Sequence, residues 1–159
     1  MARLEELVIN VEEYLDVCDA ALDGYAQVCR ALGDDLVSVR LDDVPGSNSA
    51  FGLVAHVVGV MARWGRTVNR GIAVPRDRDA EFRATGTVDE ALALLDAGRA
   101  GLHEDVAAAR PREAPVAPPP PEDDVAATQG AVLLHVYEEL AQHLGQLEVT
   151  RDVLLSRNR

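Results

Sequence analysis

Apolar residues recur at alternating spacings of four and three along the first 32 residues of the chain. This heptad pattern places them on one face of an α-helix, with Glu and Asp on the other faces. It predicts a helix from about Leu4 to Leu32, ended by Gly33 as a C-terminal cap. The predicted face consists of Leu4, Val8, Val11, Leu15, Cys18, Leu22, Tyr25, Cys29 and Leu32.

A second apolar face follows after a short loop. Ser47 or Asn48 can cap a helix that continues to about Arg70. Gly52 and Gly59 lie seven residues apart on one side of this helix. Because glycine weakens a helix, we expect this pair to permit the close approach of a neighbouring segment. The apolar face consists of Leu53, Val57, Val60, Trp64 and Val68.

The next stretch, IAVPRDRDAEFRATG at 72–86, is expected to be a loop. Thr87 and Glu90 then form a capping box for a third helix that runs to about Ala109. Its apolar face consists of Leu92, Leu95, Leu102 and Val106.

The segment 111–124 contains four consecutive prolines, which exclude a helix and favour an extended chain. An interdomain linker and a crossover within one bundle would both have this composition. We favour the crossover, because the single helix that follows, capped by Thr128 and ending near Ser156, cannot bury an apolar face alone. The sequence thus predicts an all-α protein, in which residues 1–159 form one four-helix bundle with a long Pro-rich connection.

Composition limits the functions open to this chain. It has 159 residues and a formal net charge of −12, and all 15 cationic side chains are Arg. Such an acidic chain repels phosphate backbones, so we do not expect nucleic-acid binding. No signal peptide or membrane-spanning stretch is visible, so a cytoplasmic protein is expected. Cys18 and Cys29 are eleven residues apart on one predicted helix, too far for a disulfide, and are expected to be buried thiols.

Polar residues interrupt the apolar faces of the second and fourth helices. Glu139 and His143 lie one turn apart inside the apolar face of the fourth helix, and His56 lies inside that of the second. A divalent metal held by these three side chains would offset the cost of burying them and would leave coordination positions open for water or substrate. Zinc suits these ligands, and nickel, iron(II) or manganese would also fit. The simpler alternative is a surface pair on the fourth helix and an ordinary core histidine on the second.

The stretches GLVAHVVGVMARW, around His56, and HVYEELAQHLGQLEVTRDVL resemble the DinB-like superfamily of metal-binding four-helix bundles. Together with PGSNSAFGLVAH and VPRDRDAEF, they are particularly similar to its actinobacterial branch related to mycothiol-dependent enzymes, which includes mycothiol transferases and the N-terminal domain of maleylpyruvate isomerase. The resemblance implies that His56, Glu139 and His143 are metal ligands. It also implies mycothiol as the co-substrate and is consistent with a homodimer.

Other residues are candidates for the surroundings of the site. His135, one turn before the predicted carboxylate ligand, could orient that ligand, act as a base, or lie on the surface. Asn48, Arg76, Arg78 and Glu81 lie in or near loops that could surround the mouth of a pocket, where they would contact the thiol cofactor or be solvated.

These features favour a metal-dependent transferase that activates a low-molecular-weight thiol, mycothiol by resemblance, for attack on a small electrophile. One alternative is a metal-dependent hydrolase of amide or ester conjugates, for which His135 is the candidate base. Another is a non-enzymatic, metal-binding, stress-related bundle.

Overall fold

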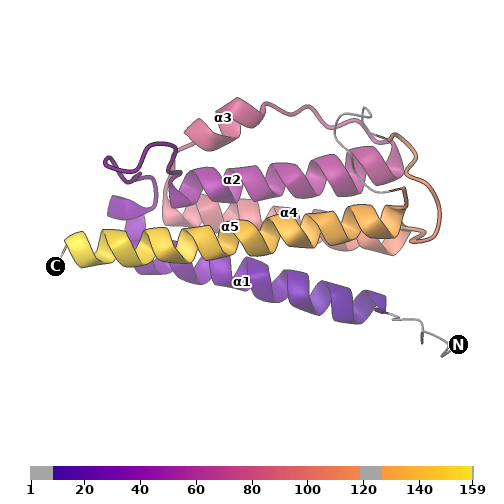
Figure 1. The fold of residues 1–159 in the computed structure, drawn as a ribbon, viewed down its shortest axis with the longest axis horizontal. Helices are drawn as coiled ribbons and strands as arrows, with labels where there is room; N and C mark the ends of the chain where they lie inside the picture. The colour runs from indigo at the N-terminus through magenta and orange to yellow at the C-terminus, as the bar shows by residue number, and fades with distance from the viewer. Residues whose placement is uncertain (1–8, 119–126, 159) are drawn as a thin grey trace, which may run out of the picture.

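Long helices make up the protein, and they lie side by side along its longest axis (Figure 1). The structure, a computed structural model, describes residues 9–118 and 127–158. Within these residues it contains no strand, which confirms the all-α prediction. The elements are α1 (Val11–Leu36), α2 (Ala50–Met61), the π-helix η1 (Ala62–Asn69), α3 (Arg78–Arg83), α4 (Val88–Ala108) and α5 (Gln129–Arg157).

The first helix begins later than the apolar periodicity predicts. Asn10 and Glu13 form a capping box, so α1 starts at Val11, and Leu4 lies outside the described residues. Gly33 adopts a φ of 67°, which interrupts the helix where a cap was predicted, and a short helical stretch then continues to Leu36. The predicted face is buried from its middle onwards, at Cys18, Leu22, Tyr25, Cys29 and Leu32.

The second helix begins and ends close to the predicted bounds. Its cap is Ser49, one residue after Asn48, and the Ser49 hydroxyl accepts a hydrogen bond from the backbone N–H of Gly52 at 3.1 Å. After Met61 the chain continues without a break as η1 and ends at Arg70. All five predicted core residues are buried.

The prediction of a loop at 72–86 is wrong in its middle, because residues Arg78–Arg83 form the short helix α3, capped by Asp77. In Figure 1, α3 lies over α2 on the side away from α1. A Cβ added to Gly52 would lie 3.1 Å from the carbonyl oxygen of Phe82, and one added to Gly59 would overlap the carboxylate of Glu81. The two glycines therefore do permit a close approach, and the approaching segment is α3.

The third and fourth predicted helices correspond to α4 and α5. The capping box of Thr87 and Glu90 is present, and the Thr128 side chain caps α5 as predicted. The Pro-rich segment 111–124 falls only partly within the described residues, so the crossover stays a prediction. Tyr25 of α1 donates a hydrogen bond to the backbone carbonyl of Leu140 at 2.9 Å, which ties the middle of α5 to the core. None of the described helices combines the length and the apolar character needed to span a bilayer.

Candidate metal centre

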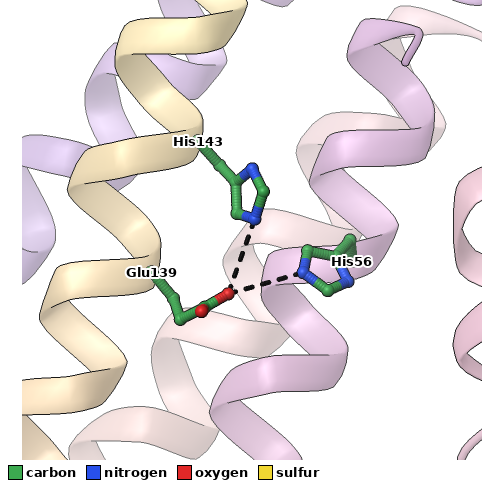
Figure 2. Close-up of side chains that lie close together, drawn as sticks. All are labelled: His56, Glu139 and His143. Atoms are coloured by element: carbon green, nitrogen blue, oxygen red, sulfur yellow. Dashed lines mark ion pairs between the residues drawn. The ribbon is translucent and has the colours of Figure 1, made fainter. Parts of the chain in front are cut away.

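The three predicted ligands meet between α2 and α5 (Figure 2). Oε2 of Glu139 lies 3.5 Å from Nε2 of His56 and 3.5 Å from Nε2 of His143. The two imidazole rings meet edge to face, with centroids 4.8 Å apart. One ligand atom from each residue can be chosen so that all three atoms lie within 4.8 Å of one another. Two helices that are distant in sequence thus bring two nitrogens and one carboxylate oxygen together.

Burial differs across the three residues. His56 is 2% exposed and lies within the core. The side chains of Glu139 and His143 are 24% and 21% exposed, so the part of the site on α5 reaches solvent and is less buried than its apolar surroundings suggest. This asymmetry leaves one side of the site open to a small molecule.

Partners on the outer side of each ring determine which nitrogen faces inward. Nδ1 of His56 lies 3.0 Å from Oε2 of Glu81, and an ionised carboxylate can only accept a hydrogen bond, so Nδ1 carries the proton. Nδ1 of His143 lies 3.1 Å from Oε1 of Gln146, which also accepts. Both Nε2 atoms are therefore left as lone-pair donors that point toward Glu139.

The inward-facing nitrogen of His56 is the one that requires an explanation. Nε2 is buried and, within the described residues, has no hydrogen-bond partner. Its nearest polar neighbour is the Glu139 carboxylate, which also offers only lone pairs. Such an arrangement needs a hydrogen-bond donor or a cation at its centre.

The ionisation of Glu139 favours a cation. The neighbouring imidazoles, His143 first and His56 second, hold the pKa of this carboxyl far below its ordinary value, so Glu139 is anionic at neutral pH. The same contact with Glu139 raises the pKa of His143, so a proton competes with a metal for that nitrogen. Two imidazole nitrogens and one carboxylate suit a divalent transition metal and leave coordination positions free.

A supporting layer behind His56 comes from α3 and the loop before it. Arg76 holds Glu81 through Nε–Oε1 and Nη2–Oε2 contacts of 2.7 and 2.9 Å. Phe82 stacks on the His56 ring with centroids 4.3 Å apart. Histidine ligands of metals usually donate their second N–H to such a carboxylate, which fixes the orientation of the ring. Glu81, which sequence reasoning placed at a pocket mouth, thus lies directly behind the predicted metal ligand.

A pocket of about 280 Å³ opens beside the site. His135 lies on its wall rather than on the outer surface: its ring meets Trp64 edge to face at 5.1 Å, and its Nε2 lies 3.9 Å from Oε1 of Glu139. Asn48 does not line the pocket. The lining residues are His56, Val60, Arg63, Trp64, Arg76, Arg78, His135 and Glu139.

A second hollow of about 220 Å³ lies between the start of α1, the end of α4 and the start of α5, and its lining is mainly apolar. Tyr14 is its only titratable lining residue, and burial raises the pKa of that phenol far above the physiological range. The hollow therefore offers no acid–base or metal chemistry, and the pocket beside Glu139 is the candidate site.

The two cysteines do not contribute a nucleophile. Cys18 and Cys29 are both buried and free, as predicted. Burial raises the pKa of each thiol to about 11, so neither forms a thiolate at neutral pH. A reaction that needs a thiolate would have to take it from a bound small molecule.

Comparison with known proteins gives one family. No curated protein matches the chain. A family model described as Mycothiol-S-transferase matches residues 11–155, a span that includes all three predicted ligands and the α3 segment behind them. The chain belongs to the mycothiol S-transferase family.

Proposed function

We propose that this protein is a metal-dependent S-transferase that joins mycothiol to a small electrophile. His56, Glu139 and His143 would hold the metal, for which zinc is the best match to the ligands and nickel, iron(II) or manganese are alternatives. The observation that carries the proposal is the buried Nε2 of His56, which faces an anionic carboxylate and lacks a hydrogen-bond partner in the described structure.

A bound divalent cation would lower the pKa of a thiol beside it, so that the thiolate predominates at neutral pH. The chain itself supplies orientation and a proton acceptor. Glu81, held by Arg76, contacts the His56 ring on one side, Phe82 stacks on that ring, and Trp64 lines the pocket. His135 lies on the pocket wall near Glu139 and would take the thiol proton.

In a substitution the thiol sulfur forms a bond to the electrophilic carbon, and the leaving group departs with the electron pair of the bond that breaks. The thiol proton passes to His135 and from there to solvent. Charge therefore moves from sulfur onto the electrophile within the pocket. Contact of Asn48, Arg76 and Arg78 with the thiol, a homodimer and a cytoplasmic location stay predictions.

The test is elemental analysis of the purified protein, with wild type beside His143→Ala. We expect about one metal equivalent per chain in the wild type and its loss in the variant, because one of three ligands is gone. His103→Ala is a matched control: this histidine lies on α4 and pairs with Asp19 at 3.0 Å, away from the site.

Conjugation of mycothiol to 1-chloro-2,4-dinitrobenzene, followed at the thioether product, tests the reaction. Metal-dependent product formation by wild type and its loss in His143→Ala are expected. Equal metal content in wild type and His143→Ala would overturn the ligand assignment. Turnover of esters without any thiol would favour the hydrolase, and metal binding without either activity would favour a non-enzymatic bundle.

A further inference from the structure

The pocket beside the metal centre differs in charge from the rest of the chain. The protein carries a formal net charge of −12. Three arginines nevertheless line this one pocket, Arg63, Arg76 and Arg78, against a single carboxylate, Glu139. Glu139 is already committed to the two histidines, so the pocket presents a cationic wall to whatever enters it.

Two of these arginines have no acidic partner in the part of the chain that the structure describes. Arg76 is already paired with Glu81, as described above. Neither Arg63 nor Arg78 makes a hydrogen bond or an ion pair within the described residues. Each guanidinium instead lies over an aromatic ring, Arg63 at 5.9 Å from the centre of Trp64 and Arg78 at 5.2 Å from the centre of Phe82.

Stacking on an aromatic ring restricts a guanidinium to few orientations, and its N–H groups stay free for a ligand. The two groups come from different elements, Arg63 from η1 and Arg78 from the start of α3. Arg78 lines the same pocket as His56 and Glu139, two of the three predicted metal ligands.

We propose that Arg63 and Arg78 bind an anionic group, a carboxylate, sulfonate or phosphate, on the electrophile, and so make this transferase selective for acidic acceptors. This inference rests on the proposed function. The electrophile is the expected source of the anion because the proposed function puts the thiol at the metal, which leaves the arginine-lined wall of the same pocket to the electrophile. A guanidinium in a partly desolvated pocket recognises such groups through paired N–H donors.

The first test compares two acceptors with the same reactive ring, 3-maleimidopropionate and N-ethylmaleimide. In both, the thiol sulfur bonds to one ring carbon, the C=C bond becomes single, and the other carbon takes a proton from water. With metal-loaded protein and mycothiol, we expect kcat/KM to be at least about tenfold higher for the carboxylate, after subtraction of the uncatalysed rate. The Arg63→Met, Arg78→Met double variant should lose this preference, and Arg83→Met, on α3 but outside the pocket lining, should keep it.

The second test needs neither metal nor turnover. Trp64 is the only tryptophan of the chain and lies in the pocket, so its fluorescence reports occupancy. Metal-free protein titrated with the unreactive 3-succinimidopropionate should show saturable, salt-sensitive quenching. The double variant should bind about tenfold more weakly, while N-ethylsuccinimide should cause no comparable change.

The outcomes separate this inference from the proposed function. Equal kcat/KM for the two maleimides, with no carboxylate-dependent change at Trp64, would overturn the anion site and leave the transferase intact. Failure to conjugate either maleimide, with the Trp64 response present in wild type and lost in the double variant, would support the anion site and overturn the transferase. If the double variant instead loses discrimination between 3-mercaptopropionate and 2-mercaptoethanol as thiols, the anion belongs to the thiol and the assignment to the electrophile is wrong.

Discussion

The continuous helix formed by α2 and η1 contributes to two charged clusters. In one of them the buried polar group is paired, and in the other it is not. Toward the end of η1, the carboxylate of Asp105, from α4, receives Arg66 and Arg70 at 3.2 and 2.5 Å. Asp105 is 2% exposed and its charge is paired. In the middle of α2, His56 is equally buried, but its Nε2 lacks a hydrogen-bond partner in the described structure.

The contrast separates two uses of buried polar groups. A cluster whose charges are paired by its own side chains holds helices together and needs nothing further. A cluster that lacks a central cation is incomplete without a ligand. The Arg66–Arg70–Asp105 cluster therefore fits a structural role, and the His56–Glu139–His143 cluster is the one we propose as the functional site.

The largest effect is expected from disruption of the complete cluster. In the double variant Arg66→Met, Arg70→Met, Asp105 would be buried without a cation. Removing the partners of a buried charge costs about 3–5 kcal/mol, and the partial exposure of both arginines favours the lower end of that range. Denaturant unfolding should show this loss, with metal content per folded chain unchanged.

The control for that variant is Arg63→Met, on the same helix but without an ion pair in the described part of the chain. It should change the free energy of unfolding by less than about 0.5 kcal/mol. If the double variant were as stable as this control, Asp105 would not be the structural anchor that its contacts indicate.

The supporting layer of the site should matter for metal affinity more than for folding. Glu81→Gln keeps the size of the side chain but removes the charge that Arg76 and His56 contact. Loss of such an outer carboxylate typically weakens metal binding 10–100-fold, so we expect about tenfold, or about 1.4 kcal/mol, by competition with a chelator.

Glu104→Gln is the matched control, because Glu104 is exposed and pairs with Arg66 at 3.0 Å, in the other cluster. Its metal affinity should equal that of wild type. Unchanged affinity in Glu81→Gln would mean that the His56 ring is held by packing against Phe82 alone.

Most of the fold is predictable because the signals are local. Thr87 and Thr128 cap helices whose apolar residues recur every three or four positions. The helix α3 is missed because the six residues Arg78–Arg83 are too few and too polar to show a period. The two glycines of α2 nevertheless predict that a neighbouring segment packs closely against that helix.

The predicted start of the first helix is wrong for a related reason. The apolar spacing continues upstream to Leu4, while the capping box of Asn10 and Glu13 sets the actual start. The apolar spacing alone could not show whether the spacing or the capping box sets the start of the helix. The capping box does, because it satisfies backbone N–H groups that would otherwise lack partners.

The sequence predicts which side chains come together at the candidate site, but not their geometry. The spacing of Glu139 and His143 puts them on one face, and His56 interrupts another apolar face. The direction of each ring depends on Glu81 and Gln146, and the contact between Glu81 and His56 forms only when α3 docks. A tertiary contact of this kind leaves no spacing pattern in the sequence.

A third prediction compares the same type of substitution in both clusters. In excess chelator, His56→Leu should change the free energy of unfolding by no more than about 1 kcal/mol, because it removes an unpartnered buried nitrogen along with one hydrogen bond. Asp105→Leu should cost about twice as much, since it leaves two arginines without their partner. A loss above about 3 kcal/mol in His56→Leu would show that the site is complete without a metal.

The smallest effect concerns the pH dependence of the free energy of unfolding. The contribution of the His56–Glu139–His143 cluster should change with pH in opposite directions with and without metal. Because the folded-state pKa of His143 is raised above 6.5, chiefly by its contact with Glu139, this pair stabilises the metal-free protein fully below pH 6.5. The contribution is lost as the pH rises through the raised pKa. It should amount to a few tenths to about 1 kcal/mol, since both side chains are partly exposed.

Denaturant unfolding in chelator, from about pH 6 to about pH 9, should therefore show a decline in wild type that is absent from His143→Gln. The lowered pKa of Glu139 acts well below this range, where its contribution is lost as the pH falls, so it does not mask the effect. With zinc in excess the sign reverses: the stabilisation due to metal should grow as the pH rises, because a metal binds the nitrogen of His143 only after its proton leaves. Parallel curves for wild type and His143→Gln in both conditions would mean that neither proton nor metal occupies the space facing Glu139, and the contrast with the Asp105 cluster would no longer identify a site.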